Sequence, residues 1–163
     1  HWLFDTPTDK IDVVIHPQSI IHSIVEFVDG SQIAQMSIPD MKLPIQYALT
    51  YPERLESTIN ALNLEDLEEL TFYPADREAF PALGLAFRAL EIGGTAPAIL
   101  NAADEIAVNA FLNGKIRFSE ITSLVRECMN SIKITHRISL EDILDADRNA
   151  RDWVVERIKE QAR

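Results

Sequence analysis

The pattern of apolar and polar positions divides the chain into a strand-like first part and a helical second part. Residues 20–28 (IIHSIVEFV) and 31–37 (SQIAQMS) are rich in β-branched and apolar side chains, and Asp29-Gly30 separates them. A two-residue Asp-Gly link favours a type I′ turn because both central positions need a positive φ. These residues therefore predict a β-hairpin.

The turn at Asp29-Gly30 gives an expected register in which Glu26 lies opposite Ile33 and His22 opposite Ser37. Because side chains alternate between faces, one face is expected to be a core face: Ile21, Ser23, Val25, Phe27, Ala34, Met36 and Ile38. The other face carries Ile20, His22, Ile24, Ile33, Gln35 and Ser37. The three polar residues of this second face, His22, Gln35 and Ser37, are expected to cluster at the end of the hairpin away from the turn. An isolated hairpin is marginal in water, so we expect a larger sheet covered on both sides.

Irregular segments flank the predicted hairpin at this polar end. His16-Pro17-Gln18-Ser19 enters the hairpin and Pro39-Asp40-Met41 leaves it, and their prolines mark strand ends. Loops held by a rigid sheet are a common place for a functional site. The polar cluster is therefore a candidate site. The alternative is that His22 is a buried, hydrogen-bonded histidine that only supports these loops.

The rest of the chain predicts an α+β protein in three parts. Residues 1–52 hold a helix end at 1–4, a short strand at 11–15, the hairpin and a short helix at 44–49. Residues 53–79 are acidic, lack a clean hydrophobic period and predict a long connector. Residues 80–163 predict a C-terminal four-helix bundle, with helices over 80–92, from a Thr95 cap to Leu112, from a Ser119 cap, and from a Ser139–Asp142 capping box.

The apolar faces of the four helices give the expected core of this bundle. They comprise Phe80, Leu83, Phe87 and Leu90, then Ile99, Leu100, Ala103, Ile106, Ala107, Ala110 and Phe111, then Ile121, Leu124, Val125, Cys128 and Met129, then Leu140, Ile143, Leu144, Ala150, Val154 and Ile158. Gly93-Gly94 and Asn113-Gly114 are expected to end the first two helices.

The charge and hydropathy of the chain exclude several classes of protein. The 26 acidic and 15 basic residues give a net charge of −11, which argues against a nucleic-acid or anionic-membrane surface. The sequence has no apolar run of 18 residues, so it predicts no transmembrane helix. Residues 1–10 (HWLFDTPTDK) do not resemble a signal peptide. The single cysteine, Cys128, excludes an intramolecular disulfide and fits a reducing compartment.

Few residues carry an independent chemical signal. The four histidines and Cys128 lack zinc-finger or HExxH spacing, so no metal ligands are predicted within this chain. Cys128 is expected to be a core thiol because it lies on an apolar stripe. A polar helix face is expected to be solvated or packed against another domain rather than catalytic; it comprises Asn101, Asp104, Glu105 and Asn109. No Gly-rich nucleotide-binding turn is present.

Two long motifs resemble the 1-deoxy-D-xylulose 5-phosphate reductoisomerase family. They are IHPQSIIHSIVEFVDGSQIAQMSIPDMKLPI (residues 15–45) and LNAADEIAVNAFLNGKIRF (residues 100–118). The family more often has asparagine where this chain has Asp104. The resemblance covers essentially the whole chain and implies the end of a catalytic domain, a connector and a helical bundle.

The resemblance also implies an activity, its cofactors and a set of site residues. The family is homodimeric and uses NADPH and a divalent cation (Mg²⁺, Mn²⁺ or Co²⁺) to convert 1-deoxy-D-xylulose 5-phosphate to 2-C-methyl-D-erythritol 4-phosphate in isoprenoid synthesis. By resemblance, Ser19 lies near the substrate phosphate, His22 supports the active site, and Pro39 and Met41 lie near the nicotinamide.

The resemblance leads to further expectations about this chain by itself. The family's nucleotide-binding turn and metal ligands lie upstream of the position of His1, so the chain alone is expected to be inactive and to bind no cofactor. A homodimer built on the hairpin, a cytoplasmic location in a bacterium, and no nucleic-acid or membrane partner are expected. The alternative is a non-catalytic acidic dimerisation or scaffold module of similar architecture.

Overall fold

The computed structural model describes residue 1 and residues 3–161, and it divides the chain into two compact units. The helical unit comprises His1–Asp12 and Asp76–Arg163, and the hairpin unit comprises Val13–Ala75. Trp2, in the predicted helix end at 1–4, and residues 162 and 163 lie outside the described residues. Helices and strands both occur, which confirms the α+β class. No helix in the described part is long and apolar enough to cross a membrane.

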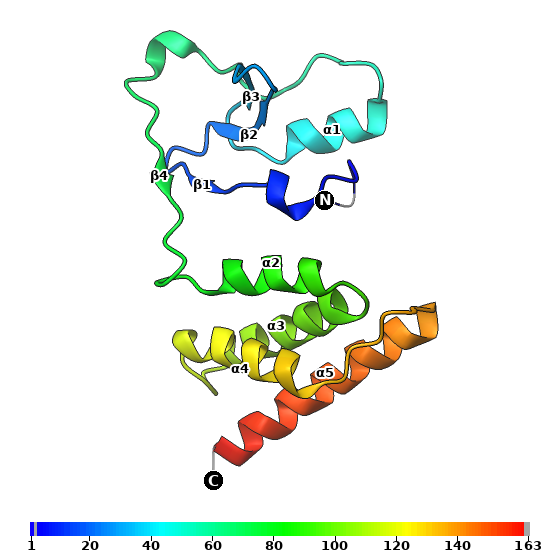
Figure 1. Cartoon of the computed structure of the whole chain (residues 1–163). Coiled ribbons are helices and arrows are strands. Elements are labelled where there is room, and N and C mark those ends of the chain that lie inside the picture. The colour runs from blue at the N-terminus through cyan, green and yellow to red at the C-terminus, as the bar shows by residue number, and fades with distance from the viewer. Residues whose placement is uncertain (2, 162–163) are drawn as a thin grey trace. The chain divides into compact units, whose positions relative to one another are not determined.

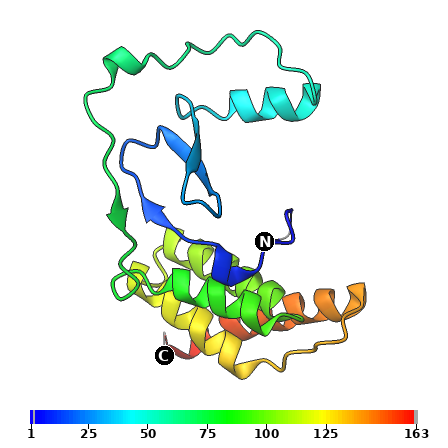
Figure 2. The ribbon, with the colours of Figure 1, turned by 45° about the horizontal axis from the view of Figure 1, so that its top comes forward.

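The helical unit contains four α-helices and one short 3-10 helix (Figures 1 and 2). They are η1 (Thr8–Lys10), α2 (Ala82–Ile92), α3 (Ala96–Leu112), α4 (Phe118–Ser131) and α5 (Leu140–Gln161). Helix α3 contacts α2, α4 and α5, and η1 contacts α2. Helices α2, α4 and α5 therefore share one neighbour, α3, around which the core forms.

Small side chains on α3 and a complete apolar stripe on α4 make most of this core. Ala102, Ala103 and Ala107 have no exposed surface. Such small residues let neighbouring helices approach closely, because the side chains at a contact set the distance between helix axes. The predicted stripe of α4 is confirmed, since all of its members are buried: Ile121, Leu124, Val125, Cys128 and Met129.

The predicted apolar face of α2 is wrong. The buried residues of this helix are Leu85 and Ala89, whereas Phe80 is 65% exposed. Helix α2 begins at Ala82, so Phe80 lies before it, where its N–H donates to the carbonyl of Asp76. Because α2 packs mainly against α3, only a narrow stripe of the helix is buried.

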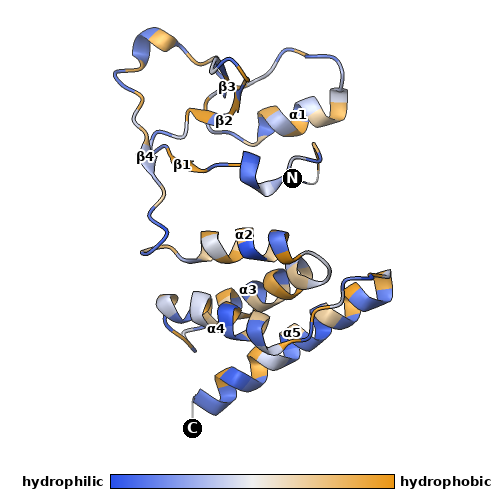
Figure 3. Ribbon diagram, in the orientation of Figure 1, coloured by the Kyte–Doolittle hydropathy of each residue, from blue (hydrophilic) through white to orange (hydrophobic). Residues whose placement is uncertain are grey.

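Helix α5 is buried in its middle and exposed near its start. Its buried residues are Ala146, Ala150 and Val154, while Leu140 is 72% exposed. This 22-residue helix is longer than the 17-residue α3, so its ends have little to cover them. The blue positions that dominate α5 in Figure 3 agree with this exposure. The prediction that Leu140 and Leu144 belong to the core is therefore wrong.

Of the three predicted helix caps, the one at Ser139 is confirmed, the one at Ser119 is wrong, and Thr95 occupies the predicted cap position without a side-chain cap bond. Ser139 Oγ accepts from the N–H of Asp142 at 3.1 Å, and the Asp142 carboxylate accepts from the N–H of Ser139 at 2.8 Å. Helix α4 begins before Ser119, and the Glu120 carboxylate accepts from the N–H of Arg117 at 2.6 Å instead. Thr95 is the N-cap residue of α3 and its carbonyl accepts from the N–H of Ile99, but its buried side chain makes no cap bond because it bonds another segment.

Thr95 joins the start of α3 to the segment that precedes α5. Its N–H donates to the carbonyl of Thr135 at 3.0 Å, and its Oγ1 accepts from the N–H of Thr135 at 3.1 Å. Gly94, with φ +57°, precedes this pair. A Cβ at Gly94 would overlap with the carbonyl oxygen of Thr135. The two segments therefore approach more closely than any residue but glycine allows.

The hairpin unit holds two small antiparallel sheets and one α-helix (Figure 1). Strand β1 (Val14–Ile15) pairs with β4 (Tyr73–Pro74), and β2 (Ile21–Glu26) pairs with β3 (Gln32–Met36). Helix α1 (Lys42–Thr50) follows β3, and η2 (Leu64–Asp66) lies in the segment before β4. The pairing of β1 with β4 was not predicted, because β4 is only two residues long and lies in the irregular acidic segment.

The hairpin itself is confirmed, but its predicted two-residue turn is wrong. The N–H of Phe27 donates to the carbonyl of Ser31 and the N–H of Gly30 to the carbonyl of Phe27, both at 2.9 Å. These bonds enclose three loop residues, with Gly30 last and at φ +83°. This is the turn plus glycine bulge that three-residue hairpin loops commonly adopt. It needs a positive φ at one position rather than at two.

The longer loop changes the register and therefore the two faces. Val25 lies opposite Ile33 and Ile24 opposite Ala34, one residue away from the expected pairing. The side chains of Val25 (56% exposed) and Ile33 (64% exposed) are not buried by any described residue. The predicted core face and the larger covering sheet are therefore not found among the residues that the structure describes.

We predict that Gly94→Ala destabilises the helical unit by more than about 1 kcal/mol, because the new Cβ would meet the Thr135 carbonyl and the residue keeps a positive φ. The matched control is Gly84→Ala within α2, where a Cβ meets nothing within 4 Å. That change should stabilise by about 0.5–1 kcal/mol through helix propensity. Urea unfolding followed by circular dichroism measures both. Equal effects of the two substitutions would contradict the close approach at Gly94.

Candidate functional site

The predicted polar cluster forms at the open end of the hairpin. Nδ1 of His22 lies 3.4 Å from Oγ of Ser37, and the side-chain amide of Gln35 donates to the same oxygen at 3.4 Å. The ladder is irregular between Ile21 and Ser23, which makes His22 the extra residue of a bulge. Bulges re-aim a side chain and are frequent beside functional sites. The cluster is confirmed, although the bulge rather than a regular register brings it together.

Ser19 occupies a tight turn just before β2. Its N–H donates to the carbonyl of His16 at 3.0 Å, and its φ of +52° lies in the left-handed region. Few residues other than glycine adopt this region, and such strain is often found at functional sites. Ser19 is exposed. A strained and exposed serine thus stands where the sequence predicts a substrate-proximal residue.

Pro39 and Met41 lie on the short link between β3 and α1, and both are exposed. The carboxylate of Asp40 accepts from the N–H of Lys42, the first residue of α1, at 2.8 Å. The carbonyl of Met41 accepts from the N–H of Ile45 at 3.1 Å. Asp40 therefore holds the link against the start of the helix, a role that the sequence reasoning missed.

One backbone hydrogen bond relates these predicted residues to one another. The N–H of Ser37 donates to the carbonyl of Ile20 at 3.1 Å. Ser19 immediately precedes Ile20, and Pro39 follows Ser37 by two residues. The entry and exit of the hairpin are therefore adjacent, which places Ser19, His22 and Pro39 at the same end of the hairpin.

The structure also brings in residues that the sequence reasoning did not connect. Nδ1 of His16 lies 2.8 Å from the carbonyl oxygen of Thr71 and carries the hydrogen, because a carbonyl only accepts. The His16 ring stacks on Phe72 with 4.6 Å between ring centroids. The side chain of Gln18 bonds Thr71 as well. No local signal could reveal these pairs, because more than 50 residues separate their members.

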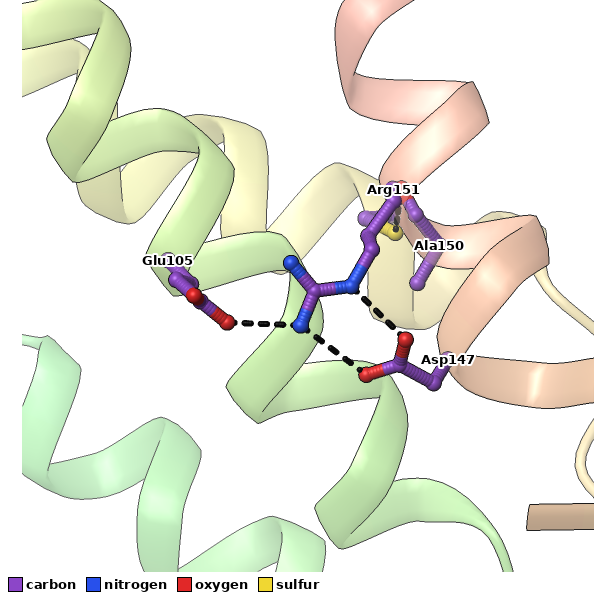
Figure 4. A network of polar contacts seen from close by, with 5 residues as sticks. Glu105, Asp147, Ala150 and Arg151 are labelled. Atoms are coloured by element: carbon purple, nitrogen blue, oxygen red, sulfur yellow. Dashed lines mark hydrogen bonds and ion pairs between the residues drawn. The ribbon is translucent and has the colours of Figure 1, made fainter. Parts of the chain in front are cut away.

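The polar face of α3 has a structural explanation. Its four residues, Asn101, Asp104, Glu105 and Asn109, are all exposed. Figure 4 shows the Arg151 guanidinium of α5 between two carboxylates, those of Glu105 at 2.6 Å and Asp147 at 2.7 Å. The hydrogen bonds to Asp147 and Glu105 hold the pKa of Arg151 above its usual value. Glu105 thus ties α3 to α5, which agrees with the prediction of a non-catalytic face.

Two further features carry no sign of chemistry. Among the residues that the structure describes, no three His, Cys, Asp or Glu side chains lie close enough to hold a metal ion. A surface depression of about 430 Å³ is lined only by residues of α5: Asn149, Asp152, Trp153, Glu156, Arg157 and Glu160. Residues of a single helix cannot enclose a ligand, so we assign no binding site there.

Cys128 is confirmed as a core thiol. It has no exposed surface and lies among the buried residues of α3, α4 and α5. Its Sγ lies 3.8 Å from the carbonyl oxygen of Ala150. Burial raises the pKa of the thiol from 9.0 to about 11. Because the thiolate is the reactive form, Cys128 is unsuited to nucleophilic or redox chemistry.

The chain was compared with known families and proteins. The family model described as DXP reductoisomerase C-terminal domain matches residues 36–153, most of the chain. The chain belongs to this family. The match begins at Met36, the last residue of β3, covers α1 to α4 and ends within α5, so it includes Pro39 and Met41 but not Ser19 or His22.

Individual relatives extend the match beyond those residues. The 1-deoxy-D-xylulose 5-phosphate reductoisomerase of Chlorobium chlorochromatii is 55% identical over 93% of this chain and 40% of its own length. The protein of the same name from Acetivibrio thermocellus is 52% identical over 98% of this chain and 42% of its own length. The chain thus spans about two fifths of the length of these curated relatives.

Solved structures give the same result. The enzyme from Zymomonas mobilis in complex with NADPH matches 96% of this chain and 41% of its own, with a TM-score of 0.89 and 41% identity. A DOX-P reductoisomerase in complex with NADPH, fosmidomycin and magnesium matches 92% of this chain and 39% of its own, with a TM-score of 0.85 and 41% identity. The fold of this chain is therefore that of part of the reductoisomerase.

We predict that Cys128 makes folding stability fall at alkaline pH. The thiol pKa is raised in the folded state, so its contribution is present below pH 9.0 and is lost as pH rises toward about 11. The free energy of unfolding should therefore fall more steeply over this range for the unsubstituted chain than for Cys128→Ala. Urea titrations at several pH values give the free energy of unfolding of each protein, and the contributions of all other titrating groups cancel when one value is subtracted from the other. A difference between the two proteins that stays the same from pH 9 to pH 11 would contradict the raised pKa of Cys128.

Proposed function

We propose that this chain is the C-terminal part of a 1-deoxy-D-xylulose 5-phosphate reductoisomerase that forms 2-C-methyl-D-erythritol 4-phosphate with NADPH and a divalent cation. The observation that carries the proposal is the family match over residues 36–153, joined to relatives more than 50% identical over nearly the whole chain. The two structural neighbours crystallised with NADPH or magnesium support the choice of cofactors. The reaction fits a cytoplasmic bacterial enzyme.

The proposed role of this chain in the reaction is to form one wall of the active site. Ser19 hydrogen-bonds the substrate phosphate, directly or through water, from its exposed position in the strained turn. His22, held near Ser37, supports the same wall. Pro39 and Met41 contact the nicotinamide ring, and the 69% exposure of Met41 leaves its side chain available for this contact.

The remaining chemistry is assigned to parts of the longer protein outside this chain. NADPH supplies the hydride, and the cation polarises the substrate oxygens when both are bound. The metal ligands are proposed to lie outside this chain, because the described residues bring no three suitable side chains together. We therefore expect this chain to bind and orient the substrate rather than to react with it.

The proposal also assigns a role to each region. Residues 1–52 complete the catalytic domain, residues 53–79 form the connector, and residues 80–163 form the C-terminal four-helix bundle. The exposed side chains of Val25 and Ile33 support a location of the hairpin at a twofold dimer interface. The net charge of −11 gives no support for a nucleic-acid partner.

The activity is tested with the full-length protein that contains this chain. We expect NADPH oxidation that requires both 1-deoxy-D-xylulose 5-phosphate and Mn²⁺ or Mg²⁺, and none from the 163 residues alone. Ser19→Ala should raise the KM for the substrate while kcat changes little. The matched control, Ser31→Ala, removes a serine at the opposite end of the hairpin, where it bonds Asp29. A folded full-length protein without activity would refute the proposed reductoisomerase function and favour the non-catalytic scaffold alternative.

The dimer is tested by light scattering on the same full-length protein. We expect a dimer, and we expect Val25→Asp or Ile33→Asp to shift it toward the monomer, because a charge would then be buried without a partner. Val28→Asp is the control, since Val28 lies fully exposed in the hairpin loop. A monomeric unsubstituted protein, or equal dissociation by Val28→Asp, would contradict the assigned interface.

A further inference from the structure

The connector returns to the segment that leads into the Ser19 turn. Strand β4 pairs antiparallel with β1, with Val14 opposite Pro74 and Ile15 opposite Tyr73. The residues just beyond this short ladder are His16 on one side and Phe72 on the other. Antiparallel pairing therefore carries Thr71 and Phe72 alongside the turn formed by residues 16–19.

Gln18 and Thr71 make a multiple polar contact across this junction. The side-chain amide of Gln18 donates from Nε2 to the Thr71 hydroxyl at 2.8 Å. Its Oε1 accepts from the Thr71 hydroxyl at 3.1 Å and from the Thr71 N–H at 3.3 Å. Both ends of the amide are thus engaged by one residue of the connector, which fixes its orientation.

His16 makes a second attachment at the same place. Its Nδ1–H donates to the carbonyl of Thr71, and its ring lies nearly parallel to that of Phe72, at an interplanar angle of 14°. Nε2 of His16 is buried and has no hydrogen-bond partner among the described residues. The ring is therefore held by Nδ1 and by stacking, with Nε2 left to accept.

These attachments hold the two residues on which the conformation of Ser19 depends. The carbonyl of His16 accepts from the N–H of Ser19, and Gln18 directly precedes Ser19 in the chain. Ser19 has a φ of +52°, a conformation that persists only where its surroundings impose it. The contacts of Thr71 with His16 and Gln18 supply that constraint from a segment 52 residues away in the sequence.

We propose that Thr71 and Gln18, with His16, are positioning residues that clamp the turn 16–19 to the connector and so present Ser19 to the phosphate group of the substrate. The inference rests on the proposed function, because it assigns the phosphate contact to Ser19. None of the three needs to touch the substrate. The connector thus contributes to substrate binding as well as joining two parts of the chain.

The test measures steady-state kinetics of the full-length protein. Thr71→Val keeps the shape and backbone of Thr71 but removes its hydroxyl, and Gln18→Leu removes the partner amide. Each should raise the KM for 1-deoxy-D-xylulose 5-phosphate by about 3- to 10-fold with kcat within about twofold, as expected for a misplaced binding group. The inhibition constant of inorganic phosphate should rise in parallel. Thr71→Ser, which keeps the hydroxyl, should restore both values.

A matched control separates positioning from general loosening of the connector. Gln46 also bonds the connector, donating to the carbonyls of Leu55 at 3.1 Å and Glu56 at 2.9 Å. Gln46→Leu therefore removes a similar attachment away from the Ser19 turn and should leave the KM unchanged. Thr71→Val combined with Ser19→Ala should raise the KM no more than Ser19→Ala alone, because Thr71 acts through Ser19.

The outcomes distinguish this inference from the proposed function. An active enzyme in which Thr71→Val and Gln18→Leu leave the KM unchanged overturns the clamp and leaves the proposed function intact. Additive effects of Thr71→Val and Ser19→Ala, or an equal effect of Gln46→Leu, overturn it as well. A folded full-length protein with no activity overturns the proposed function and this inference together. Circular dichroism of each variant verifies folding. A folded Thr71→Ser variant whose KM stays as high as that of Thr71→Val also overturns the clamp.

Discussion

The hydrogen bond from the N–H of Ser37 to the carbonyl of Ile20 determines where the candidate site residues lie. It closes the open end of the β2–β3 hairpin and makes the entering and leaving segments neighbours. Ser19, His22 and Pro39 are within two residues of one of its partners. A shift of the strand register at this end would move Pro39 away from Ser19 and His22, because Pro39 is attached through Ser37 and the other two through Ile20.

The two units of the chain differ in what stabilises them. Among the described residues, every buried side chain lies between Leu85 and Val154, in the helical unit. The hairpin unit buries none and exposes apolar residues such as Val25 and Ile33. The helical unit therefore has a hydrophobic core of its own. The hairpin unit has strand pairing and polar contacts such as Gln18–Thr71.

The chemistry of the candidate site agrees with a supporting rather than a reacting role. Serine and histidine side chains at the hairpin end can donate or accept hydrogen bonds, and Met41 offers an exposed apolar surface. Lys42, which directly follows Met41 in the chain, pairs with Asp40 at 3.8 Å. The phosphate contact that we propose for Ser19 would therefore be a hydrogen bond to a neutral hydroxyl rather than an ion pair.

The sequence by itself determined the elements and the local features that depend on neighbouring residues. The α4 stripe, the Ser139–Asp142 cap, and the helix ends at Gly93 and Gly114 follow from helical periodicity and backbone preferences, which act over a few residues. The location of the hairpin followed from its β-branched runs and from the Asp-Gly pair between them.

Only the tertiary structure decided the features that join distant segments or choose between local alternatives. The three-residue loop and the bulge at His22 set the register, and an Asp-Gly pair is compatible with either loop length. The Thr95 side chain bonds Thr135 instead of an N–H group of α3. Thr71 bonds Gln18, 53 positions earlier, with the hairpin and α1 between them. The physical reason is that such contacts depend on the path of the intervening chain, which no local periodicity encodes.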